Sequence, residues 1–385
     1  MDIGVLNKQA KIKLTTDQWM LVALTVSVFL TVFVQIAAIL VISIYALIKR
    51  RDMWKRRRPE AILLGCFWIL TIVVTVVYGT LPMMLLSAAL GLAYVGIVFV
   101  SHSMSSHMFN LLSEIICIAS WPCFVVALIQ MAMGLSWVYG ERYCSVFTNA
   151  NFYGMVCAIT ILLCVHNFCR TNKWGVRIFY GCTILVNCVA MYMTGSRSSI
   201  VVTAVSCAIY LIFTRRWKVL ALASAVLVIL LSIDILMGET LDLLPRMDEV
   251  VSSLNGRFGI WRNAVASITA RPIFGYGTYS YARVYNELGG WYALHAHNLL
   301  LEMVMDYGIV GLGILLGLFG VILGRSIKAN RGLRNKPGLG MVVAAYAIVL
   351  LSGMFDLAML WPQTAALLFF MISYGQEDIS AQLTE

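Results

Sequence analysis

The residues best suited to chemistry in this sequence are a few arginines and histidines that border long apolar segments. Arg197 stands in TGSRSS, directly after one such segment, and Arg257 stands in NGRFGIW. Arginine carries a permanent charge and a planar donor fork that matches a phosphate group. His295 and His297 stand together in LHAHN, and histidine is the side chain that exchanges protons near neutral pH. The pattern predicts anion binding by the arginines and proton transfer by a histidine.

Each of these residues also has an ordinary structural explanation. Arg197 can cap a helix boundary with its side chain extended to the membrane surface. Arg257 can be one of several interfacial arginines, because Arg262 and Arg271 follow it closely. A His-x-His pair can bind a metal ion, but no carboxylate or thiolate lies at the partner spacing that a zinc site needs. The sequence therefore predicts no metal site and no cofactor.

The apolar segment that begins after His297 carries one polar stripe. Asn298, Glu302 and Asp306 are spaced four residues apart, so on a helix they share one face. The stripe is interpreted either as structural packing against other helices or as polar support for a proton-handling His297. Helix positions two residues apart point about 200° apart, so we expect only one of His295 and His297 to face an outer cavity.

Composition assigns all of these residues to a membrane protein. Of the 385 residues, 61% are hydrophobic and only 12% are charged, against roughly 25% charged in a typical soluble domain. A soluble enzyme, a disordered chain and a secreted disulfide scaffold are excluded, and the ten cysteines are interpreted as small buried apolar residues. The net charge of +10 is explained by basic cytoplasmic loops, without nucleic acid as a partner. We predict a single integral membrane domain over residues 1–385.

A membrane-crossing helix needs about 20 apolar residues, and about eleven segments (10–12) meet that requirement. They are 19–48, 61–79, 82–100, 110–134, 152–169, 177–194, 198–213, 219–237, 297–324, 341–357 and 361–375. The first segment is predicted as one long tilted helix. With the basic loop 49–58 in the cytoplasm and the others alternating, cytoplasmic loops hold 18 of the 28 lysines and arginines, as the positive-inside rule requires.

Residues 238–296 form a long loop without a membrane span, on the predicted outer side. Within it, residues 256–270 repeat apolar residues at helical spacing, which predicts an amphipathic interfacial helix. Arg271-Pro272 should end this helix, and Gly275-Tyr276-Gly277 should form a turn. Because so long a loop is uncommon without a function, we expect it to carry part of the active site.

Four strings in this sequence are together similar to the O-antigen ligase/polymerase superfamily, the WaaL- and Wzy-like membrane glycosyltransferases. The similarity covers roughly residues 145–315. In chain order the strings are FTNANFYG (147–154), TGSRSS (194–199), NGRFGIWRNAVASITARPIFGYG (255–277) and HAHNLLLEMVMDYGIVGLG (295–313).

The resemblance implies an all-α, GT-C-like membrane fold and a metal-independent, inverting glycosyltransferase in the bacterial cytoplasmic (inner) membrane. Such an enzyme takes a glycan from undecaprenyl diphosphate and transfers it to an acceptor hydroxyl on the extracytoplasmic face. Carried onto this sequence, the family's catalytic residues are His297, Arg197 and Arg257. Substrate contacts are expected from polar residues of the same strings, namely Arg262, Arg271, Asn298, Glu302 and Asn151.

The acceptor stays open at this point. A polymerase of surface polysaccharide, acting on a glycan or lipid-linked acceptor, is the more widespread role, and a ligase acting on lipid A-core is the alternative. Membrane lipids are the other expected partners. A transporter or flippase of the same lipid-linked glycans would carry charges at the membrane midplane in several spans. Here Glu302 and Asp306 are the chief charges within a predicted span, which favours the enzyme.

Overall fold

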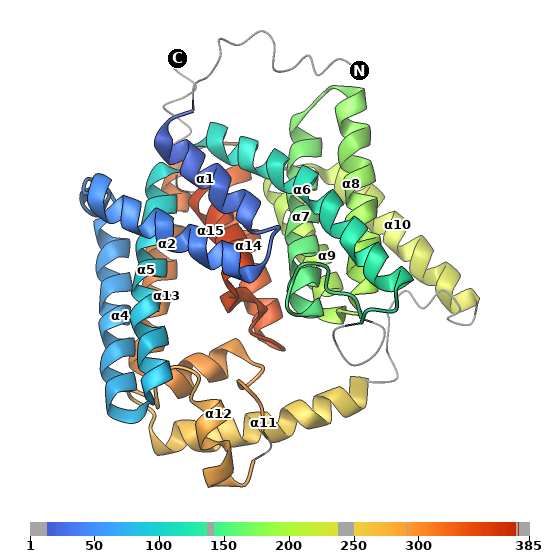
Figure 1. The fold of residues 1–385 in the computed structure, drawn as a ribbon. Coiled ribbons are helices and arrows are strands. Elements are labelled where there is room, and N and C mark those ends of the chain that lie inside the picture. The colour runs from blue at the N-terminus through green and yellow to red at the C-terminus, as the bar shows by residue number, and fades with distance from the viewer. Residues whose placement is uncertain (1–13, 137–141, 238–249, 291, 375, 377–385) are drawn as a thin grey trace.

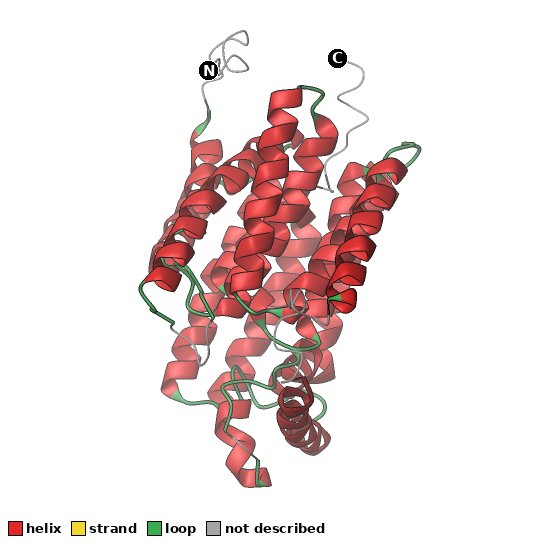
Figure 2. Cartoon of the chain, turned by 90° about the vertical axis from the view of Figure 1, so that its right-hand side faces the viewer, coloured by secondary structure: helices red, strands yellow, loops and turns green. Residues whose placement is uncertain are grey.

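The computed structural model describes residues 14–136, 142–237, 250–290, 292–374 and 376, which form helices and loops without a strand (Figure 2). The long elements of its first part are α1 (Thr16–Ser27), α2 (Val32–Lys49), α4 (Arg58–Tyr78), α5 (Leu81–Ser103), α6 (Ser106–Ala132), α7 (Ala150–Arg170), α8 (Trp174–Met193), α9 (Arg197–Phe213) and α10 (Trp217–Leu236). Those of its second part are α11 (Val250–Ala270), α13 (Leu299–Ala329), α14 (Pro337–Gly353) and α15 (Pro362–Tyr374). Short turns of helix are α3 (Met53–Arg56), α12 (Tyr281–Val284), η2 (Tyr285–Leu288) and η3 (Ala358–Leu360).

The protein is an all-α polytopic membrane protein, as predicted. Eight helices of the described residues are long and apolar enough to cross a membrane, and α9 and α14 are shorter apolar helices. Ten of the predicted segments each coincide with one helix to within a few residues. Apolar side chains on α10 are exposed almost throughout, and α10 lies at the edge of the molecule (Figure 1), so this helix presents its surface to lipid.

The prediction of one long helix over 19–48 was wrong, because the segment divides into α1 and α2. The chain leaves the helical path between Ser27 and Val32. The carbonyl groups of Val28 and Leu30 are left without helical partners there, and the Gln363 side-chain amide of α15 donates to both, at 2.8 and 2.9 Å. A glutamine 333 residues further along the chain thus supplies the donors for these carbonyl groups. No residue pattern within 19–48 predicts the break.

The loop segment predicted to be outside forms one end of the molecule, where α11 and α12 lie across the ends of α4 and α5 (Figure 1). The predicted interfacial helix is α11, which begins earlier than expected, at Val250, and ends at Ala270, directly before Arg271-Pro272. Gly275 and Gly277 both have positive φ, 71° and 92°, which confirms the predicted turn. The first part of the predicted loop, 238–249, lies outside the described residues.

Helix α13 is broken at Gly308, where φ is 65° and ψ is −171°. The chain segment 272–277 fills the break and takes over the backbone hydrogen bonds that the helix loses there. Four bonds join the two segments: Tyr276 N–H to the Met305 carbonyl (2.9 Å), Gly277 N–H to the Asp306 carbonyl (2.8 Å), Ile309 N–H to the Pro272 carbonyl (2.9 Å) and Val310 N–H to the Ile273 carbonyl (3.3 Å). Two carbonyl groups and two N–H groups freed by the kink are therefore satisfied, as the backbone of a membrane protein requires.

The break also decides which part of α13 crosses the membrane. Its 31 residues would extend about 46 Å, well beyond the roughly 30 Å of a hydrocarbon core. Residues 309–329 alone span about 31 Å. Glu302 and Asp306 precede this part, although the whole of α13 is one candidate membrane span. They lie in the first turns of the helix, which are fastened to the preceding loop.

Candidate functional site

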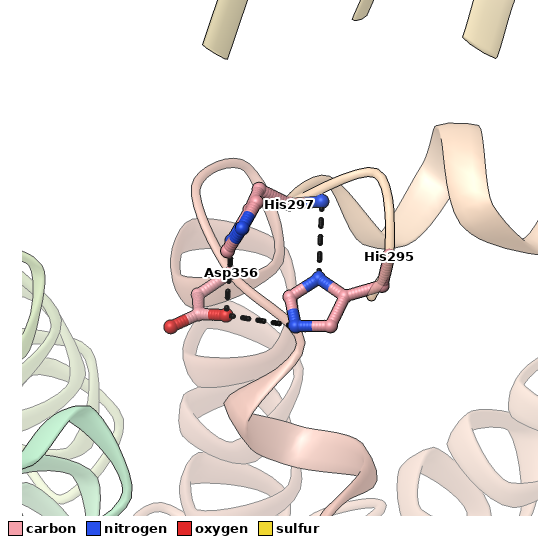
Figure 3. Close-up of side chains that lie close together, drawn as sticks. All are labelled: His295, His297 and Asp356. Atoms are coloured by element: carbon pink, nitrogen blue, oxygen red, sulfur yellow. Dashed lines mark hydrogen bonds and ion pairs between the residues drawn. The ribbon is translucent and has the colours of Figure 1, made fainter. Parts of the chain in front are cut away.

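Asp356 is the centre of the candidate site, in the loop between α14 and η3. Its side chain is buried, with 7% of the residue exposed. One carboxylate oxygen accepts from the Asn151 side-chain amide at 2.7 Å and the other accepts from the Leu357 N–H at 2.8 Å. The Nδ1 atom of His297 lies 3.7 Å and the Nε2 atom of His295 lies 4.0 Å from that second oxygen (Figure 3). Residues far apart in the sequence thus converge on one carboxylate.

Both histidines face Asp356, so the prediction that the two residues point about 200° apart was wrong. The prediction assumed helical geometry, but α13 begins at Leu299, after both residues, with Asn298 as its N-cap. His297 has a φ of 49°, a left-handed conformation that is uncommon for a residue with a side chain. It turns the chain so that the two rings lie with centroids 4.2 Å apart. Backbone strain of this kind is concentrated at functional sites.

The hydrogen bonds fix the tautomer of His295 and give the two rings different surroundings. The His297 backbone N–H donates to Nδ1 of His295 at 3.2 Å, so that nitrogen carries no proton and the neutral ring bears its proton on Nε2, toward Asp356. Nδ1 of His297 is buried without a hydrogen-bond partner among the described residues, although 34% of the side chain is exposed. The exposed part of this ring is therefore its other edge, which carries Nε2.

His295, His297 and Asp356 each offer one atom within 4.8 Å of the others, the spacing of a metal site. The hydrogen bonds do not suit a metal ion. A histidine that binds a metal through one ring nitrogen normally donates an N–H from the other nitrogen, whereas Nδ1 of His295 accepts one. Its Nε2 therefore holds a proton where a metal would need the lone pair. The cluster is better suited to moving a proton than to holding a cation.

Burial and charge set the ionisation of this cluster. Burial and, to a smaller extent, the nearby His297 lower the pKa of the His295 ring, Asp356 opposes both effects, and the resulting pKa is about 4. Burial raises the pKa of the Asp356 carboxyl, but the neighbouring His297, with donation from Leu357 and Asn151, outweighs burial and brings the pKa to about 2. At neutral pH the carboxylate is therefore ionised and His295 is neutral.

Asn151 connects the histidine cluster to the start of α9. Its side-chain oxygen accepts from Arg142 at 2.6 Å, while its amide donates to Asp356. Arg142 also donates to the carbonyl of Thr194 at 2.7 Å, three residues before Arg197, which is the first residue of α9 and is partly buried. The strings FTNANFYG and TGSRSS therefore meet at the same end of the molecule as the histidines.

The polar stripe of α13 fastens the loop that carries the histidines. The Asn298 side chain caps α13 by accepting from Leu301 N–H at 3.1 Å, and it donates to the Met354 carbonyl at 3.2 Å. Glu302 is buried and accepts from the Ala296 N–H at 2.6 Å. Asp306 accepts from the backbone of Tyr279 and from the backbone and hydroxyl of Ser280. These contacts agree with the structural interpretation of the stripe.

The three arginines of the long loop have separate surroundings. Arg257 is partly buried on α11 and donates to the Ser253 hydroxyl one turn earlier, at 2.9 Å. Arg262 is exposed on the same helix. Arg271 lies between two aromatic rings, 4.0 Å from the Tyr78 centroid and 4.5 Å from the Tyr276 centroid. Among the described residues, no hydrogen bond or ion pair joins any of these arginines to Asp356. The substrate contacts predicted for the three arginines stay predictions.

Sequence reasoning missed Asp356 and Arg142. Asp356 lies within the predicted apolar segment 341–357, and Arg142 lies between the predicted segments 110–134 and 152–169. An ionisable residue at the end of an apolar segment was the available signal for Asp356, because such residues are costly in a membrane and usually have a partner. No spacing in the sequence relates either residue to His297.

Together the fold and this cluster define a polytopic α-helical membrane protein with a polar cluster of two histidines and a carboxylate at one end. Residues 182–316 match the model of the O-antigen ligase family (Wzy_C), over about a third of the chain. The match confirms the resemblance to the O-antigen ligase/polymerase superfamily and supports a membrane glycosyltransferase of this type. No curated protein matches the chain.

Proposed function

We propose that the protein transfers a glycan from undecaprenyl diphosphate to an acceptor hydroxyl at the outer leaflet of the bacterial cytoplasmic membrane, as a polymerase of surface polysaccharide. One observation carries this proposal. The His297 ring has Nδ1 beside the ionised Asp356 carboxylate, 3.7 Å away, while its other edge is exposed. A carboxylate beside one ring nitrogen orients a histidine whose opposite nitrogen accepts a proton.

In the proposed reaction, Nε2 of His297 takes the proton from the acceptor hydroxyl. The hydroxyl oxygen attacks the anomeric carbon, and the bond from that carbon to the diphosphate oxygen breaks, with the electron pair leaving on the diphosphate. Direct displacement inverts the configuration at the anomeric carbon. Asp356 stabilises the imidazolium that forms, and the 3.7 Å separation is one that commonly shortens when substrate binds.

The leaving diphosphate gains negative charge as the bond breaks. Arg197, at the start of α9, and Arg257, on α11, are proposed to neutralise this charge, since donors aimed at a developing charge supply much of enzymatic rate enhancement. Arg257 lies on α11, so this role assigns part of the active site to the long outer loop. No step in the mechanism needs a metal ion.

Turnover of a defined undecaprenyl-diphosphate oligosaccharide by the purified protein tests the proposal. We expect chain extension when a second lipid-linked repeat unit is the acceptor, and loss of extension by 10²–10⁴-fold in His297→Ala with donor binding retained. His107→Ala, at an exposed histidine outside the site, is the matched control. Transfer to lipid A-core in place of a repeat unit would identify a ligase. Movement of the donor across liposomes without any transfer would contradict the enzyme.

Lysine substitutions test the arginines. Arg197→Lys and Arg257→Lys keep a charge but lose the bidentate fork, so each is expected to retain only part of the turnover, while the alanine variants lose it. Arg58→Lys, at an exposed arginine, should behave as wild type. Full activity in both lysine variants would show that these arginines do not bind the diphosphate through a defined bidentate geometry.

A further inference from the structure

A basic hollow lies at the opposite end of the molecule from Asp356. Its volume is about 270 Å³, and it is lined by Thr214, Arg215, Arg216, Arg334 and Asn335. These residues connect α9 to α10 and precede α14. Because α9 begins, and α14 ends, near the histidine cluster, and each is a helix of 17 residues, the hollow lies about 25 Å from that cluster.

The charge of the hollow is entirely positive. Three of its five lining residues are arginines and none is acidic, and among the described residues no acidic side chain forms an ion pair with Arg215, Arg216 or Arg334. The three arginines are exposed around one open hollow, where water screens their mutual repulsion and an anion bound between them would relieve it further. Their planar donor forks match the oxygens of a phosphate group.

The backbone at the hollow is held in a defined arrangement. Arg216 donates from its guanidinium to the Cys169 carbonyl at 2.7 Å, and the Lys336 N–H donates to the Phe213 carbonyl at 3.1 Å. Arg215 has a φ of 55°, a strained conformation for an arginine. The two connections that supply the arginines are thus joined to each other, and the hollow is a built feature of the fold.

Two helix starts add to the positive potential. Helix α10 begins after Arg216 and α14 begins after Lys336, and neither start has a side-chain cap among the described residues. The first N–H groups of an uncapped helix remain available to acceptors, except at Pro337, which opens α14 and has no N–H. The start of a helix also carries a partial positive charge. Both features favour an anion at this end of the two helices.

The surroundings of the hollow are apolar and exposed. Trp217 is 56% and Ile212 is 44% exposed, and tryptophan is typical of the boundary between lipid and water. A ligand whose phosphate occupies the hollow can therefore lay acyl chains along the neighbouring surface. Soluble phosphate would satisfy the arginines but would leave this apolar surface uncovered.

We propose that the hollow binds the phosphodiester group of an anionic phospholipid, in the leaflet opposite the candidate active site. A zwitterionic phospholipid is disfavoured, because it would bring a cationic headgroup into a cavity that already holds three cations. The proposal is independent of the glycosyltransferase proposal, since the two sites share no residue.

Thermal melting of the full chain in detergent, with added short-chain phospholipid, tests the site. We expect phosphatidylglycerol to raise the melting temperature of the wild type and phosphatidylcholine to leave it unchanged. Arg215→Gln and Arg334→Gln should each weaken phosphatidylglycerol binding about fivefold. Arg331→Gln, at an exposed arginine of the same loop as Arg334 that does not line the hollow, is the matched control and should bind as wild type.

Two further arms make the test decisive. Arg215→Lys keeps the charge and should retain more binding than Arg215→Gln, which separates loss of the site from misfolding. Equal stabilisation by phosphatidylcholine, or unchanged binding in the Arg215→Gln/Arg334→Gln double variant, would overturn the proposal. If inorganic phosphate stabilises the protein as much as phosphatidylglycerol does, the ligand of the hollow is free phosphate and the proposal of a lipid is wrong.

Discussion

The neutral ring of His295 makes the protein sensitive to mild acid, and the size of the effect follows from its surroundings. The pKa of this ring is about 4 in the folded protein against an ordinary 6.5. Below pH 6.5 the unfolded chain binds a proton that the folded chain refuses until about pH 4, so stability is lost as the pH falls through that window. The difference corresponds to about 3 kcal/mol in the free energy of unfolding.

His295→Asn removes this titration with little change in shape. The asparagine side-chain oxygen can replace Nδ1 as the acceptor of the His297 N–H. We therefore expect the variant to unfold near the wild-type free energy at pH 7 and to be about 3 kcal/mol less sensitive to acidification down to about pH 4. Asp356 does not interfere, because its pKa of about 2 lies below the window, and His297 is present in both proteins.

Reversible unfolding by SDS in mixed micelles, followed by tryptophan fluorescence at a series of pH values, measures this difference. His107→Asn, at an exposed histidine, is the control and should keep the wild-type pH dependence. If His295→Asn loses stability on acidification as steeply as the wild type, His295 is not held neutral by its surroundings and the assigned proton positions are incorrect.

Further predictions concern the break in α13, the carboxylate, metal ions and topology. Gly308→Ala should lower the free energy of unfolding by about 3 kcal/mol, because a Cβ there would collide with the backbone of the loop. Gly313→Ala is the control and should be neutral, because a Cβ at Gly313 meets open space. Equal effects of the two variants on SDS unfolding would argue against the break. Asp356→Asn should reduce turnover about 10²-fold or more without weakening donor binding, and wild-type turnover in this variant would exclude the carboxylate from the mechanism. Added EDTA should leave turnover unchanged, and a strict requirement for Mg²⁺ or Mn²⁺ would contradict the protonation assigned to the histidines. Single cysteines in 250–296 should react with an impermeant thiol reagent from outside, and those in 325–336 only after permeabilisation; labelling of the long loop from the cytoplasm would reverse the topology.

The sequence was sufficient for features that depend on local composition. Ten apolar segments became ten helices, and Arg271-Pro272 ended α11 where it was expected to. His297 was predicted as a site residue because its string resembles a family, and that role stays a prediction. Its geometry was not predicted, since a left-handed His297 before the helix depends on the Asn298 cap and on bonds to the loop after α14.

The missed features all depend on partners distant in the sequence. Asp356 is about 60 residues from His297 and 205 residues from Asn151, and a single sequence contains no sign of such pairings. The division of α1 from α2 depends on Gln363 in the same way. Polar residues in apolar segments were visible, but whether each one binds substrate or satisfies a distant backbone group is decided only by the packing of the helices.

The four hydrogen bonds across the break in α13 have a consequence for motion. The amide protons of Tyr276, Gly277, Ile309 and Val310 are all protected by the same pairing of segments, so they should exchange with solvent in one common opening event. The loop cannot detach without exposing the interior of α13, and the start of α13 is tied to the histidines through Ala296 and Asn298. Any movement of this loop must therefore carry the first turns of α13 and both histidines with it.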